Sequence, residues 1–119
     1  MLNQLKKFIK PIYLIFIRVV WRLRNRHNST TLNSVHINKV TVGKLTYGEI
    51  NLLHVYGSEN EKLSIGSFCS IGPDVKFILG GEHHYDYFST FPLKVKALNL
   101  KSEAYSKGEI RVEDDVWIG

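Results

Sequence analysis

Large apolar residues recur every six positions in the middle of the chain. They stand at Ile65, Ile71 and Phe77, and glycine follows the first two of them, as Gly66 and Gly72. This period matches neither the 3.6 residues of an α-helix nor the two-residue alternation of an ordinary β-strand. A six-residue period predicts a parallel β-helix, in which each repeat supplies one short strand and one turn. The branched side chain fills the interior, and glycine is expected to relieve the backbone where the turn favours positive φ.

The pattern extends beyond this stretch in both directions. It returns near the C-terminal end with Val112, Val116 and Ile118, and residues 40–48 resemble an earlier, irregular coil. Residues 49–61 fit the period poorly. We therefore predict an all-β body over residues 31–119, interrupted by a long loop insertion at about 79–110 where the period lapses.

A different pattern occupies the first thirty residues. Apolar residues there alternate in steps of three and four, which places them on one stripe of an α-helix. They are Leu2, Leu5, Ile9, Ile12, Phe16, Val19 and Leu23. Pro11 either stands in the first turn of a helix that begins there or kinks a longer one. The polar run 27–31 ends the helix, and we place the domain boundary at residue 30.

The charge is divided unevenly along the chain. Residues 1–30 hold seven of the sixteen lysines and arginines and none of the eleven acids, so the remainder carries nine bases against eleven acids. The basicity belongs to the helix, and because no recognition motif accompanies it, nucleic-acid binding is not predicted. Arg18 and Arg22 interrupt the apolar stretch, and a spanning helix needs about 20 mostly apolar residues. Two interpretations stay open: contact of residues 1–26 with a lipid surface, or packing on the body or on a sister helix.

Length and cysteine usage restrict the class of protein. A chain of 119 residues with 44% hydrophobic residues suits one domain. Cys69 is the single cysteine and has no partner for an internal disulfide. It falls four positions after Ile65, so we expect a small, packed, free thiol. The chain shows no secretory cleavage signal, and we expect a cytoplasmic location, with possible peripheral attachment at the inner face of the membrane.

The lapse in the period is the place where function is expected, because long loops in compact repeats are usually functional. The chain leaves the repeat at Gly80 and Gly81, just before His83 and His84. Hydroxyl and aromatic residues follow that are candidates for lining a groove and binding a substrate, namely Tyr85, Ser89 and Phe91. Histidine suits general base catalysis because its unperturbed pKa of about 6.5 lies near working pH. Neighbouring histidines of an extended strand point to opposite faces, and no third ligand is regularly spaced, so no metal is predicted.

At this point the residues resemble a known family. The repeat from Ile65 to Val75, the Gly80-to-His83 run, the Ser-Thr-Phe-Pro run at 89–92 and the Asp-Asp-Val-Trp-Ile-Gly run at 114–119 occur in the order found in hexapeptide xenobiotic acetyltransferases. That family includes the chloramphenicol and streptogramin acetyltransferases. The likeness covers about residues 30–119. The basic N-terminal segment adds a likeness to relatives that O-acetylate capsular or lipopolysaccharide sugars.

The resemblance implies an all-β fold, a left-handed parallel β-helix, assembled as a cytoplasmic homotrimer with active sites at subunit interfaces. It implies acetyl-CoA as donor and direct transfer to a hydroxyl of a capsular or lipopolysaccharide sugar, or alternatively of an antibiotic. The family's base corresponds to His83, and a gapless comparison with the streptogramin type selects His84. Trp117 and Gly119 lie in the coil that adjoins the cofactor in the family.

A second class of function is also open. Family members continue beyond the Val-Trp-Ile-Gly motif with further coils, whereas this chain stops at Gly119. We therefore expect either a fragment of a longer product or a non-catalytic remnant that serves as a trimerisation or interaction module.

Overall fold

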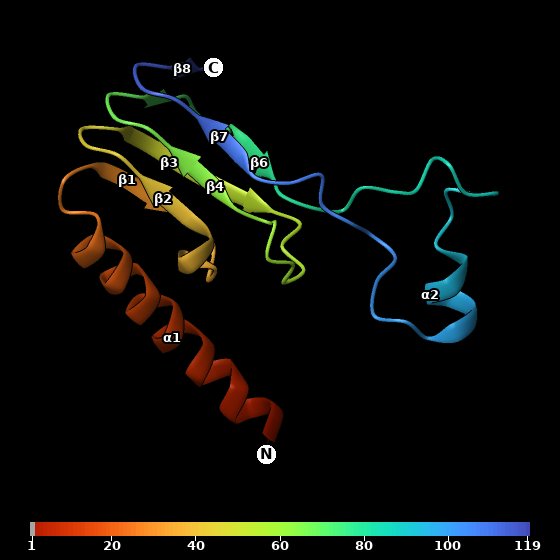
Figure 1. The fold of residues 1–119 in the computed structure, drawn as a ribbon. Coiled ribbons are helices and arrows are strands. Elements are labelled where there is room, and N and C mark those ends of the chain that lie inside the picture. Colours follow the sequence, from red (N-terminus) through yellow and green to blue (C-terminus); the bar gives the residue numbers. More distant parts are fainter. Residues whose placement is uncertain (1) are drawn as a thin grey trace.

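A computed structural model describes the backbone of residues 2–119 and the side chains from Ile9 onward (Figure 1). One long helix precedes a body of short strands, and a short helix interrupts the later part of that body. The elements are α1 (Leu2–Arg24), β1 (Ser29–Leu32), the 3₁₀ helix η1 (Ile37–Lys39), β2 (Val40–Val42), β3 (Tyr47–Leu53), β4 (Leu63–Ile65), β5 (Ser70–Ile71), β6 (Lys76–Ile78), α2 (Leu93–Leu98), β7 (Ile110–Val112) and β8 (Trp117–Ile118).

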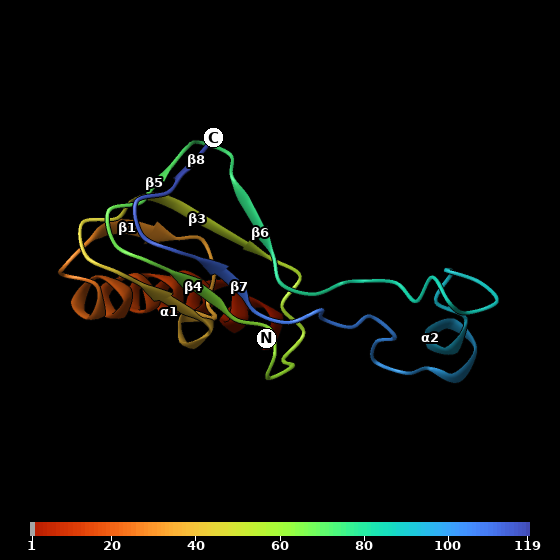
Figure 2. The same ribbon diagram turned by 45° about the horizontal axis from the view of Figure 1, so that its top comes forward.

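Every pairing between these strands is parallel. One sheet has the order β1-β3-β5-β8, a second has β2-β4-β7, and the C-terminal half of β3 pairs with β6 as a third face. Viewed along the stack, these faces enclose a triangular outline (Figure 2). The prediction of an all-β body built from parallel strands is confirmed at this level.

The register shows how the six-residue period builds the stack. Ser29 pairs with Tyr47, which lies 18 residues later, and 18 residues are three six-residue repeats. The next partners are farther apart in sequence, 23 residues from Tyr47 to Ser70 and 47 residues from Ser70 to Trp117. One turn of the coil therefore consumes three repeats, and the extra residues leave the stack as excursions.

All of the excursions leave at one corner. The connections at the other corners are tight turns over residues 43–46, 66–69, 72–75 and 113–116. By contrast, the connections that lead into the β2-β4-β7 sheet span residues 33–39, 54–62 and 79–109. The two longest connections thus emerge from neighbouring coils on the same side of the body (Figure 2).

The predicted periodic positions form the core. Ile65, Ile71 and Phe77 are buried, each 4–5% exposed, and they belong to one cluster with the residues above and below them. Cys69 is a free and fully buried thiol whose Sγ donates to the carbonyl oxygen of Glu113 at 3.1 Å. The expectation of a packed cysteine is confirmed.

The explanation of the glycines by positive φ is wrong for Gly66 and Gly72. Neither has positive φ, and the left-handed positions of three equivalent turns are held by Leu45, Phe68 and Asp115, at φ of 59–62°. Gly66 is required by close approach between coils instead. A Cβ built there would lie 2.7 Å from the backbone nitrogen of Asp114, closer than real Cβ atoms come.

The turn before β3 is stabilised by a buried hydroxyl. Thr46 is fully buried, and its Oγ1 donates to the carbonyl oxygen of Gly66 at 2.7 Å. The same oxygen accepts the backbone N–H of Cys69 at 3.1 Å. One side chain therefore satisfies two backbone groups of the next coil, which buried backbone groups require.

Helix α1 covers the end of the stack opposite β8 (Figure 1). Trp21 is 3% exposed, and its Nε1 donates to the carbonyl oxygen of Thr30 at 3.1 Å. Arg22 donates to the carbonyls of Thr30, Asn25 and Asn28 at 2.7–2.9 Å, which satisfies backbone oxygens at and after the end of the helix. Pro11 lies inside the helix rather than in its first turn. No helix among residues 2–119 has the length and apolarity needed to cross a bilayer.

Candidate functional site

The site is built on the excursion of residues 79–109, which narrows to a neck where it leaves the stack. Glu82 and Tyr105 form an antiparallel bridge, with N–O distances of 3.1 and 3.2 Å. The carboxylate of Glu82 also contacts Lys107 Nζ at 3.1 Å. This hydrogen bond, followed by the charge attraction, raises the pKa of Lys107 above its ordinary value. The hydroxyl of Ser106 donates to the carbonyl oxygen of Leu79 at 2.6 Å, so both arms of the neck are tied together.

The expected sharp exit at the paired glycines is present. Gly81 has a φ of +88°, a conformation that favours glycine, whereas Gly80 does not have positive φ. Gly80 is instead held close to the preceding excursion, because a Cβ there would lie 2.6 Å from Glu61 Oε1 and 2.9 Å from the carbonyl oxygen of His54.

The outer part of the excursion contains a helix that the sequence did not predict. Helix α2 follows Pro92 and ends at Asn99, which adopts the left-handed conformation with φ of 54°. This outer part projects away from the stack (Figure 1), and Phe88 at its surface is fully exposed. The long loop is therefore a small structured head on a neck.

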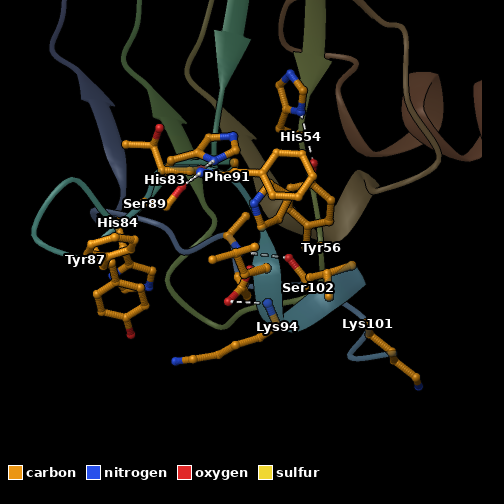
Figure 3. A pocket seen from close by; sticks show the side chains of 18 residues that line it. His54, Tyr56, His83, His84, Tyr87, Ser89, Phe91, Lys94, Lys101 and Ser102 are labelled. Carbon is orange, nitrogen blue, oxygen red and sulfur yellow. Dashed lines mark hydrogen bonds between the residues drawn. The ribbon is translucent and has the colours of Figure 1, made fainter. Parts of the chain in front are cut away.

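A cavity of about 720 Å³ lies between the head and the 54–62 excursion (Figure 3). Because the two excursions leave neighbouring coils at the same corner, residues far apart in sequence meet around it. The lining residues are His54, Tyr56, Gly81, His83, His84, Tyr87, Phe88, Ser89, Thr90, Phe91, Pro92, Leu93, Lys94, Val95, Lys101, Ser102, Glu103 and Ala104. The lining is mainly apolar with a few polar groups, as is usual for small-molecule sites.

His83 is held in a defined orientation at this cavity. Its Nδ1 lies 2.9 Å from the carbonyl oxygen of Thr90, and a carbonyl oxygen only accepts hydrogen bonds. Nδ1 therefore carries the proton in the neutral ring, which leaves the lone pair on Nε2. That is the tautomer in which Nε2 can take a proton from a bound hydroxyl.

His84 has different surroundings. Its ring stacks on Tyr87, with ring centroids 4.2 Å apart and an interplanar angle of 6°, and on Tyr105 at 4.6 Å (Figure 3). Its Nδ1 lies 3.7 Å from a carboxylate oxygen of Asp86, too far for a hydrogen bond. The stacking ties the head to the neck, since Tyr105 belongs to the bridge with Glu82.

His54 and Tyr56 are site residues that the sequence interpretation missed. His54 follows β3 with a φ of 53°, and its Nδ1 lies 3.2 Å from the hydroxyl of Tyr56. It also lies directly beside Gly81, where a Cβ would come within 3.2 Å of its ring. The only signal in the sequence was the poor fit of residues 49–61 to the six-residue period.

The other candidate residues divide into two groups. Ser89 and Phe91 line the cavity beside the histidines, and the Ser89 hydroxyl accepts the backbone N–H of Phe91 at 3.1 Å. Tyr85, Trp117 and Gly119 do not line it. Trp117 stands in β8 and is 78% exposed, so within one chain the structure does not bring it to the histidines. Among residues 2–119 no group of three His, Cys, Asp or Glu side chains is placed to hold a metal ion.

Comparison with known proteins finds acetyltransferases. The chain is 42% identical over 66 residues to a chloramphenicol acetyltransferase of Klebsiella aerogenes, covering 50% of this chain and 31% of the relative. It is 36% identical over 76 residues to a probable macrolide acetyltransferase of Lysinibacillus sphaericus, covering 58% and 42%. It is 46% identical over 44 residues to a virginiamycin A acetyltransferase of Staphylococcus aureus, covering 37% and 20%. No family model and no solved structure matches the chain.

These matches support the resemblance to xenobiotic acetyltransferases in its coarse form. The names of the relatives refer to antibiotic acceptors and give no support to the narrower likeness with capsular or lipopolysaccharide enzymes. The chain spans 31–42% of the length of the first relatives that it matches.

Proposed function

We propose that the protein is an acetyl-CoA-dependent O-acetyltransferase whose acceptor is a hydroxyl of an antibiotic-like small molecule. The observation that carries the proposal is the orientation of His83, whose Nδ1–H is bound to the Thr90 carbonyl at the edge of the cavity. The names of the relatives favour this acceptor class over the polysaccharide sugars that the basic N-terminal segment suggested.

In this mechanism His83 Nε2 takes the proton of the acceptor hydroxyl as its oxygen attacks the thioester carbonyl. A C–O bond forms and the C–S bond breaks. The thiolate of coenzyme A leaves and takes up the proton, so the products are an acetyl ester and the free thiol. The Thr90 carbonyl keeps the imidazole in the correct tautomer and stabilises the imidazolium that forms, as a hydrogen-bond acceptor on Nδ1 does in other histidine bases. We assign His84 to packing, because both faces of its ring are covered by tyrosines.

We further propose that the stack is a left-handed β-helix and that the protein is a homotrimer. The six-residue period and the four-residue corners support the first part. The exposed head supports the second: Phe88 and Leu98 are exposed on a segment that projects from its own body, and such patches usually mark protein contacts. A neighbouring subunit would complete the open side of the cavity.

The experiment that tests the function measures thiol release from acetyl-CoA by the purified protein. Chloramphenicol, a macrolide, virginiamycin A and a panel of capsular sugars serve as acceptors. We expect turnover with at least one antibiotic, and we expect His83→Gln to lower kcat by about 10²–10⁴-fold, as loss of a general base does. His84→Phe is the matched control, because it keeps the stacked ring and removes the imidazole, and it should retain activity within about tenfold.

Each alternative predicts a different result. Turnover only with sugars would move the acceptor to the polysaccharide class. Loss of activity in His84→Phe but not in His83→Gln would transfer the role of base to His84. A folded protein that releases no thiol with any acceptor would support the non-catalytic module instead.

A further inference from the structure

Helix α1 has two apolar faces, and the body covers only one of them. Ile17 and Trp21 are buried against the first coil. The side chains in 3-4-3-4 spacing face away from it and are 50–67% exposed. They are Ile9, Ile12, Phe16, Val19 and Leu23, which we call the outer stripe. Leu2 and Leu5, which continue the spacing, have side chains outside the described residues.

Basic residues surround the outer stripe. Lys10, Arg18 and Arg26 are exposed and have no hydrogen-bond or ion-pair partner within the part of the chain that the structure describes. Residues 1–30 contain four further bases and no acid. The apolar stripe and the uncompensated positive charge therefore lie on the same helix.

We infer that the outer stripe binds an anionic phospholipid surface, with α1 lying in the plane of the interface. An apolar helix face buried at the boundary between headgroups and acyl chains, with Lys and Arg at the headgroups, is the usual arrangement for such helices. The helix has 23 residues, about 34 Å at 1.5 Å per residue, and it is not apolar enough to span.

Charge favours a lipid surface over a second copy of the same helix. Two α1 helices that pair through their outer stripes bring Arg18 and Arg22 of each chain toward the same bases of the other. The helix offers no acid to compensate them, and paired helices are normally matched by opposite charges beside the apolar seam. An anionic bilayer supplies the missing negative charge.

The placement of α1 fits this role. It covers the end of the stack opposite β8, and the head with its cavity projects sideways (Figure 1). Contact of the outer stripe with a bilayer leaves the cavity free for solutes. The inference does not depend on the proposed chemistry, since it rests on the helix alone.

Co-sedimentation of the whole protein with lipid vesicles tests the inference. Vesicles of phosphatidylglycerol and phosphatidylcholine are compared with vesicles of phosphatidylcholine alone. We expect binding only to the anionic vesicles, and we expect it to weaken as added salt shortens the Debye length, which is about 3 Å at 1 M. Ile12→Ser should lower the partition coefficient about tenfold, and Arg18→Gln about fivefold.

Two matched variants make the same chemical changes elsewhere. Ile78→Ser alters an isoleucine of similar exposure on β6, and Lys44→Gln removes an exposed charge at a corner of the stack; both should bind vesicles like the unaltered protein. Sedimentation velocity distinguishes the competing occupant. If Ile12→Ser dissociates an oligomer and leaves vesicle binding unchanged, the stripe is a contact between copies and the inference is overturned. Equal binding to neutral and anionic vesicles, or binding to neither, overturns it as well.

Discussion

Replacing Thr46 with valine removes one buried hydroxyl and nearly preserves the shape of the side chain. The hydroxyl donates to the Gly66 carbonyl oxygen at 2.7 Å and accepts the Cys69 N–H at 3.1 Å. Both partners belong to the backbone of the next coil. Valine cannot make either bond, and the tight packing of the corner leaves the two backbone groups without a replacement partner.

The structure sets the magnitude of the effect. A buried backbone group that loses its partner costs about 1–3 kcal/mol. The bond to Cys69 is buried and the bond to Gly66 is partly buried, so the second group recovers some solvation. We expect Thr46→Val to lower the free energy of unfolding by about 2–4 kcal/mol, equivalent to a fall in Tm on the order of 10–20 °C.

Urea unfolding followed by tryptophan fluorescence measures this change, because Trp21 is buried and will report loss of structure. Thr46→Ser separates the two contributions of the side chain. It keeps the hydroxyl and removes a methyl group, at a cost of about 1 kcal/mol. Thr41→Val is the control for valine in a strand, since Thr41 is exposed and its hydroxyl bonds only to the exposed Ser64.

The order of the variants decides the outcome. Thr46→Val should be clearly less stable than Thr46→Ser, with Thr41→Val close to the unaltered protein. If Thr46→Val equals or exceeds Thr46→Ser in stability, the corner is held by apolar packing, and the reasoning from hydrogen bonds is refuted.

Two further predictions concern the stacking of the coils. Gly66→Ala should destabilise the protein by more than about 1 kcal/mol, the usual cost of mild overpacking, because the new Cβ would lie 2.7 Å from the backbone nitrogen of Asp114; a normal Tm would contradict the close approach. Glu109 accepts a hydrogen bond from Ser64 and next pairs with Arg111, and both lower its pKa. A lowered pKa gives stability that is present above the unfolded value of about 4.3 and is lost as pH falls through the folded value. Glu109→Gln should therefore reduce the loss of Tm between neutral and acidic pH, and an unchanged difference would show that the carboxylate contributes nothing.

The repeat could be predicted from the sequence because burial and period have the same cause. Ile65, Ile71 and Phe77 recur every six residues since each fills the interior of one side of the coil. The function of Gly66 could not be read in the same way. Its constraint comes from a backbone that lies 47 residues downstream, next to Asp114, and no local pattern encodes that approach.

The candidate site was predicted in part for a similar reason. The interruption of the period located His83, because a long departure from a repeat is visible along the sequence. His54 was missed, since it enters the cavity from the preceding coil and depends on two excursions sharing a corner. Helix α2 was also missed, because six residues that include two lysines leave too short a pattern to distinguish from a loop.

The shared corner separates the part of the molecule that sets the register from the part that varies. The coils above and below continue in alignment whether the connection spans residues 33–39, 54–62 or 79–109. A loop that closes between fixed ends costs only about 0.6 kcal/mol more for each doubling of its length. Segments of new length and composition can therefore be exchanged at this corner as interchangeable cassettes, and recognition of a new acceptor does not require a new scaffold.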